Sequence, residues 1–237
     1  MNENFKPSAM TEWERIDLQR RAEREKRHQD FKKTLSPLCK NFCVNSICVE
    51  FMGSGDSGQI EDVLINFSSS IEKLATKEKA SLITQAVNKL KANEHRPIII
   101  TPTTDFDVKH LYKVDADPSD TFREHDLKDR HKGLSDEQYA LTSEVHTILT
   151  QRFLDQVFGV QNVTNDKGME YMKQVKVTDA LDDWCYDQLE ATGHDWYNNE
   201  GGSGNFVFIN TDVDTKFKVE LSMQIYRQES DDYDFDL

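Results

Sequence analysis

The feature that most constrains the fold is a pair of glycine-rich polar segments, one near each end of the chain, that border runs of alternating hydrophobicity. The first is residues 53–58 (GSGDSG), and the second is residues 201–204 (GGSG). Alternation with a period of two is typical of strands that bury one face, and glycine allows the backbone conformations that tight turns need. The pattern therefore predicts two antiparallel β-hairpins rather than a helical bundle.

Four strands follow from this pattern. Residues 42–52 and 59–67 form the first predicted pair, and residues 205–209 and 217–226 form the second. An antiparallel sheet with one apolar face needs helices to cover that face. We therefore predict an α+β fold in which a four-stranded antiparallel sheet has helices packed on one face.

Helices are predicted where a capping pattern precedes apolar residues at a period of 3.6. A serine or threonine followed three residues later by Glu or Gln can satisfy two backbone N–H groups at a helix start. Thr11 with Glu14, Ser69 with Glu72, and Ser135 with Gln138 have this spacing. The predicted helices are residues 11–33, 70–92, about 136–158, and one that starts at Thr178 and ends at Gly193.

These elements divide the chain into five segments. They are a charged N-terminal helix (1–34), the first hairpin of the core (35–69), a helical insertion between the two hairpins (70–170), a helix with the second hairpin (171–227), and an acidic tail (228–237).

Charge is distributed unevenly between these segments. The whole chain has a net charge of -14, and residues 171–237 carry five Lys or Arg against fifteen Asp or Glu. An acidic C-terminal third repels nucleic acid and anionic membranes, and it attracts basic protein surfaces, including those that hold nucleic acid. We therefore expect a basic protein surface, such as that of a nucleic-acid-binding complex, as the partner, with no direct binding to nucleic acid or membrane.

The N-terminal residues 1–33 are charged throughout and lack the apolar stretch of a secretory signal. No segment approaches the roughly 18 to 20 continuous apolar residues of a membrane span. A cytoplasmic protein is therefore expected.

The four cysteines predict neither a disulfide framework nor a zinc site. Cys39, Cys43 and Cys48 lack the close pairing that zinc ligands show, and Cys185 lies far from them in sequence. Buried free thiols are the expectation. No motif in the chain predicts a cofactor or a metal ion.

The two glycine-rich loops offer one candidate site, because hairpin tips of one sheet can meet at the same edge. They would then share a surface that suits a ligand, a cation or a partner backbone, as in a small enzyme or ligand-binding domain. Ordinary turn chemistry explains the same residues. The side chains concerned are Asp56, Ser57, Gln59, Glu61, Asp195, Asn198, Asn199 and Glu200, with Trp196 as either a contact residue or a loop anchor.

The segment Gly55-Asp56-Ser57-Gly58 does not predict a nucleophilic serine. The chymotrypsin-like motif needs another glycine where Gln59 stands, and the serine-hydrolase elbow needs a strand-to-helix turn. No catalytic residue is predicted, and a non-enzymatic protein is favoured.

The C-terminal tail mixes carboxylates with aromatic side chains. It can serve as a docking segment whose rings anchor in a partner while the carboxylates meet Lys or Arg, or it can only increase solubility. The residues concerned are Asp231, Asp232, Tyr233, Asp234 and Phe235.

Two stretches resemble motifs of a family of small bacterial and mobile-element proteins that has no established activity. They are residues 51–61 (FMGSGDSGQIE) and residues 196–206 (WYNNEGGSGNF). The resemblance covers residues 11–67 and 176–230, and it implies a fold rather than a reaction. We therefore expect an acidic interaction protein of phage or mobile-element origin. It would inhibit or regulate a nucleic-acid-handling protein, host-defence proteins included, by presenting negative charge where nucleic acid binds. The alternative is an enzyme or ligand-binding domain built on the two loops.

Overall fold

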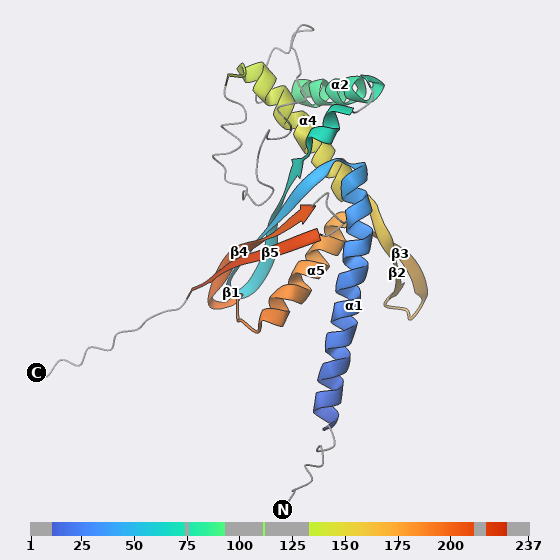
Figure 1. Cartoon of the computed structure of the whole chain (residues 1–237), viewed down its shortest axis with the longest axis vertical. Helices are drawn as coiled ribbons and strands as arrows, with labels where there is room; N and C mark the ends of the chain where they lie inside the picture. The colour runs from blue at the N-terminus through green and yellow to red at the C-terminus, as the bar shows by residue number, and fades with distance from the viewer. Residues whose placement is uncertain (1–10, 74–75, 93–110, 112–132, 211–216, 227–237) are drawn as a thin grey trace, which may run out of the picture.

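The computed structural model describes residues 11–73, 76–92, 111, 133–210 and 217–226, and within these it has four α-helices and two antiparallel sheets (Figure 1). The α+β class predicted from the sequence is confirmed. The predicted tail contacts at Asp231, Asp232, Tyr233, Asp234 and Phe235 lie outside the described residues.

The main sheet consists of β1 (Val44–Phe67), β4 (Asn198–Asn210) and β5 (Phe217–Ile225) in the order β1-β4-β5. β1 is a long strand that bends back on itself, so that its two ends lie side by side (Figure 1). Where the two ends of the strand meet, the Ser68 N–H donates to the Cys43 carbonyl over 2.6 Å. The Asn66 side-chain N–H₂ group donates to Ser46 Oγ over 3.1 Å. The first glycine-rich segment forms the bend.

The structure differs from the predicted four-stranded sheet in two respects. The main sheet has three strands, because the chain from residue 44 to residue 67 is one continuous strand. A second sheet pairs β2 (Val157–Thr164) with β3 (Glu170–Lys176), across the end of the predicted helical insertion (70–170), where the sequence predicts no strand. Most of its side chains are exposed, so the sequence has no buried alternation there that would predict strands.

Two helices cover one face of the main sheet. α5 (Val177–Thr192) lies against the sheet, and α1 (Glu12–Asn41) packs beside α5 (Figure 1). α2 (Thr76–Ala92) and α4 (Asp136–Leu154) pack against each other beyond the end of the sheet (Figure 1).

The predicted helix starts are confirmed where the capping hydrogen bonds form. Glu14 N–H donates to Thr11 Oγ1 and Gln138 N–H donates to Ser135 Oγ, each over 3.3 Å. Ser69 instead opens a short 3-10 helix (Ser69–Lys73) ahead of α2. Gly193 ends α5 with a φ of 69°, as predicted.

α1 continues past its predicted end at residue 33, even though Pro37 lies within it. A proline inside a helix costs about 3 kcal/mol relative to alanine. Leu35 and Cys39 are fully buried in this last part of the helix, and their burial offsets that cost. The opposite half of α1 projects from the body, and its side chains over residues 11–23 are exposed (Figure 1).

Aromatic rings form the centre of the core between the sheet and the helices. The Trp184 ring lies 5.4 Å from Phe31 of α1, 5.1 Å from Phe208 and 5.6 Å from Phe206 of β4, measured between ring centroids. The interaction of such ring pairs adds to the energy of burying their area. Trp184 therefore joins α5 to both α1 and the sheet.

None of the four cysteines forms a disulfide, as expected. Cys39, Cys48 and Cys185 are buried, whereas Cys43 is half-buried. Burial raises the pKa of all three buried thiols, that of Cys48 to about 12. A thiol is unreactive when its thiolate form is this scarce.

Candidate functional site

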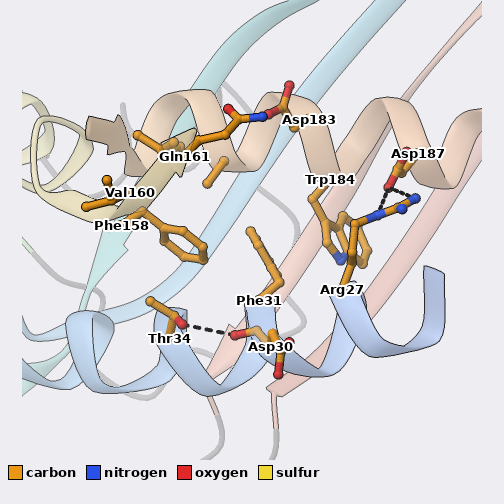
Figure 2. Close-up of a pocket in the computed structure, with 13 residues that line it drawn as sticks. Arg27, Asp30, Phe31, Thr34, Phe158, Val160, Gln161, Asp183, Trp184 and Asp187 are labelled. Atoms are coloured by element: carbon orange, nitrogen blue, oxygen red, sulfur yellow. Dashed lines mark hydrogen bonds and ion pairs between the residues drawn. The ribbon is translucent and has the colours of Figure 1, made fainter. Parts of the chain in front are cut away.

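A groove of about 390 Å³ lies where α1, α5 and the β2–β3 hairpin meet (Figure 2). Its floor is apolar and includes the rings of Phe31, Phe158 and Trp184. Polar side chains surround this floor. They are Arg27, Asp30, Thr34, Gln161, Asp183 and Asp187.

Three elements that are distant in sequence each contribute one ring to the floor. The ring centroids of Phe31 and Phe158 are 5.3 Å apart, and Phe31 stacks on Trp184 at 5.4 Å. Figure 2 shows the Phe158 ring directed from the hairpin toward Phe31. The groove exists because the hairpin packs on the helices through Phe158 and Val175, which leaves the space between them open.

Three acidic residues of α5 stand at intervals of four residues, and two of them, Asp183 and Asp187, line the groove. Asp179, Asp183 and Asp187 therefore share one face of the helix. Asp187 accepts two hydrogen bonds from Arg27 of α1, at 2.9 and 3.0 Å (Figure 2). Asp179 accepts a hydrogen bond from the Lys176 backbone N–H at 3.3 Å, at the start of the helix.

Asp183 lies between these two carboxylates and makes no ion pair with a described residue. Burial raises the pKa of Asp183, and the neighbouring carboxylates of Asp179 and Asp187 raise it further, while Lys173 lowers it. The pKa of Asp182 is raised for the same kinds of reason, by burial and then by Asp179 and Asp183. The described residues therefore neutralise the negative charge on this side of the groove only in part.

The buried ring of Trp184 has an indole N–H that makes no hydrogen bond in the described structure. Leaving a buried donor without an acceptor costs about 1–3 kcal/mol. The Trp184 side chain lines the groove, while the indole nitrogen itself is buried.

The two glycine-rich segments lie together in the main sheet. Gly55 pairs with Asn199 and Asp56 with Asn198 across β1 and β4, next to a bulge that starts at Gly53. The backbones of the two segments therefore lie side by side, as the candidate site requires.

Trp196 lies between the two segments and is only 3% exposed. A Cβ atom at Gly53 would lie 2.8 Å from Tyr197 Cα, and one at Gly58 would lie 2.9 Å from Tyr197 Cβ. Real Cβ atoms do not approach other atoms this closely. The glycines thus allow β1 to close over Trp196, and this residue acts as a loop anchor.

The other residues predicted at this surface lie on β1, on β4 or just before β4. Asp56, Ser57 and Asp195 are exposed. Gln59 Nε2 donates to Glu61 Oε1 at 2.7 Å. Glu61 also lines a polar hollow of about 340 Å³ on the outer face of the sheet. Glu200 follows Asn198 and Asn199 in β4.

One comparison with known proteins gives a match. Residues 149–236 match a family of unknown function, DUF6878. No curated protein and no solved structure shows significant similarity to the chain. The expected resemblance to an uncharacterised family is thus supported over this range.

The DUF6878 range includes the β2–β3 hairpin, all of α5, and the second glycine-rich segment. Residues 11–67, which were also expected to share the resemblance, lie outside it. The groove is therefore composite, because α1 contributes Phe31 and Arg27 from outside the DUF6878 match.

Sequence reasoning did not identify the groove. The four-residue spacing of Asp179, Asp183 and Asp187 was the available signal, because like charges at this spacing destabilise a helix. The DUF6878 match begins at residue 149 and includes these three aspartates.

Two structural absences apply to the described residues. They contain no group of three or more His, Cys, Asp or Glu side chains placed to hold a metal ion. They also contain no helix with both the length and the apolar character needed to cross a membrane.

Proposed function

We propose that this protein binds a basic surface of another protein and acts through that contact rather than by catalysis. The observation that carries the proposal is Asp183 on the rim of an apolar groove, a carboxylate that forms no ion pair with any residue in the described part of the chain. A cation from a partner would offset the repulsion among the α5 carboxylates, and nothing within the described chain fully does so.

The charge of the whole molecule supports this proposal. A net charge of -14 directs encounters with basic surfaces and speeds association at low ionic strength. Such long-range attraction also weakens as salt is added, because ions screen it within about 10 Å at 0.1 M.

The partner that fits best is a basic, nucleic-acid-handling protein, and the consequence of binding is inhibition or regulation. A surface that normally holds phosphates offers Lys and Arg to carboxylates as well. Within this proposal the protein acts in the cytoplasm and comes from a phage or mobile element.

Affinity purification of the tagged full chain from its native cells tests the proposal. Three baits are compared at low and moderate salt by mass spectrometry: the wild type, Asp183→Asn, and Asp62→Asn as a matched control. Asp62 is exposed on β1 and lies outside the groove. A basic partner that is lost at moderate salt, and reduced with Asp183→Asn alone, supports the proposal. A bait with no partner, or a partner that is insensitive to both changes, contradicts it.

A second candidate function uses the paired glycine-rich segments as a ligand-binding surface. The pairing of Asp56 with Asn198 supports it, because it brings both segments to one place. A ligand specific for this surface would raise the melting temperature of the wild type and not of the Asp56→Asn or Ser57→Ala variant. The same rise in both variants would contradict a site at these residues.

A further inference from the structure

We infer that the groove between α1, α5 and the hairpin holds a short segment of the partner protein, in which one aliphatic or aromatic side chain is flanked by Lys or Arg. This inference rests on the proposed function and specifies the chemistry of the partner. Figure 2 shows the two features it joins, an aromatic floor and an acidic rim.

The floor provides the apolar part of the recognition. Its volume of about 390 Å³ lies within the range of ligand clefts in proteins, roughly 300–1,000 Å³. Phe31, Phe158 and Trp184 give it three ring faces or edges. A side chain seated on them loses water on several sides, as in the central anchor of a protein interface.

The rim provides the charged part. Three carboxylates, those of Asp30, Asp183 and Asp187, line the groove together with one cation, Arg27. Arg27 is already bound to Asp187. Asp30 is 3.8 Å from the ammonium group of Lys33, at the edge of ion-pair distance. A ligand that is purely apolar would leave the Asp183 carboxylate beside it without a counter-charge, whereas flanking cations would supply one.

The hairpin extends the apolar surface beyond the groove. Val160 lines the groove and is 61% exposed, and Met172 on β3 is 76% exposed. Met172 lies on the same face of the hairpin as Val160, because Val160 pairs with Gln174, two residues away from Met172. Exposed apolar side chains that adjoin a cleft are typical of interaction surfaces. The occupant is therefore longer than one residue and also contacts the hairpin.

Charge argues for a different protein as occupant rather than a second copy of this chain. Two copies would each bring a net charge of -14 to the interface. A basic segment brings the opposite sign, so that attraction assists its approach.

The indole N–H of Trp184 provides a test located in the groove. The chain has three tryptophans, and each gives one indole signal in a ¹⁵N–¹H correlation spectrum. Replacing each in turn by Phe assigns the signals. The full-length labelled protein is then titrated with the unlabelled peptide acetyl-Gly-Lys-Lys-Leu-Lys-Lys-Gly-amide. Two further peptides replace Leu by Gly, or all four Lys by Glu.

The leucine–lysine peptide is expected to shift the Trp184 signal and leave the Trp196 signal in place. Replacing Leu by Gly should weaken binding about tenfold, since the burial of one aliphatic side chain is lost. The glutamate peptide should not bind. Asp183→Asn should weaken the lysine peptide about two- to fivefold, as for a rim charge pair, whereas Asp62→Asn should leave it unchanged.

Several outcomes overturn the inference. They are no shift at Trp184 with any peptide, equal shifts with all three, or a signal that changes with protein concentration alone, which would indicate a second copy. The purification experiment distinguishes these failures from failure of the proposed function. If a salt-sensitive partner is captured and Asp183→Asn reduces it, but the Trp184 signal does not move, the proposed function is supported. Only the groove as the binding site is then contradicted. If the peptide shifts the Trp184 signal but the purification captures no cellular partner, the proposed function is contradicted instead.

Discussion

Replacing Asp183 by Asn should stabilise this protein while weakening its binding. The substitution keeps the size of the side chain and removes its charge. Asp183 lies four residues from both Asp179 and Asp187 on α5. Each like-charge pair at this spacing costs about 0.2–0.5 kcal/mol in an exposed helix. Because Lys173 offsets part of this repulsion, the expected gain in the free energy of unfolding is about 0.5 kcal/mol.

The assay is urea denaturation of the wild type, Asp183→Asn and the control Asp62→Asn at neutral pH and low salt. The pKa of Asp183 is raised in the folded state, so the folded protein binds its proton more readily than the unfolded chain does. The destabilising effect is therefore full above the folded-state pKa and disappears below the unfolded value, near 3.8. The gain from Asp183→Asn should shrink as the pH falls through this window.

Three results would refute this reasoning. One is a stability of Asp183→Asn equal to or below that of the wild type at neutral pH. Another is the same gain in Asp62→Asn, which would trace the effect to net charge. The third is a gain that grows as the pH falls.

Other predictions concern packing, charge and thiols. Gly58→Ala should lower the free energy of unfolding by about 1–3 kcal/mol, because its Cβ would overlap the Trp196 ring. Gly159→Ala, where no atom lies within 4 Å of the added Cβ, should cost much less in the same urea titration. Arg27→Ala should lower stability by less than about 1 kcal/mol, as is usual for exposed ion pairs. It should also strengthen lysine-peptide binding in the nuclear magnetic resonance titration, and weaker binding would contradict an acidic groove. Alkylation at pH 8 followed by mass spectrometry should leave three thiols unmodified in the folded protein and modify them in urea; modification of the folded protein would contradict their burial. They are Cys39, Cys48 and Cys185.

Local features of the fold could be predicted where neighbouring residues determine the structure. The capping boxes at Thr11 and Ser135 depend on residues three apart, and both form. Gly193 ends α5 because only a residue that tolerates positive φ fits there. The alternation in the main sheet reflects one face packed on α5 and α1.

Features that depend on tertiary contacts were missed. The extension of α1 through Pro37 depends on packing against residues that are distant from residue 37 in the sequence. The β2–β3 hairpin contacts the core through few residues, so buried and exposed side chains do not alternate regularly along its strands. The groove needs Phe31, Phe158 and Trp184 from three elements at once, and no local pattern indicates that they meet.

The projecting half of α1 sets the distance between an exposed tryptophan near the start of the helix and the groove. An α-helix rises 1.5 Å per residue, so Trp13 lies roughly 27 Å along the axis from Phe31 in the groove. Eighteen residues also make five full turns, so both side chains leave the helix in the same direction. Trp13 is 80% exposed. If a partner binds at Phe31 as proposed and extends along α1, it would meet a second aromatic side chain at this fixed spacing. A partner shorter than the spacing would reach only one of the two rings, so the length of α1 would select partners by their size.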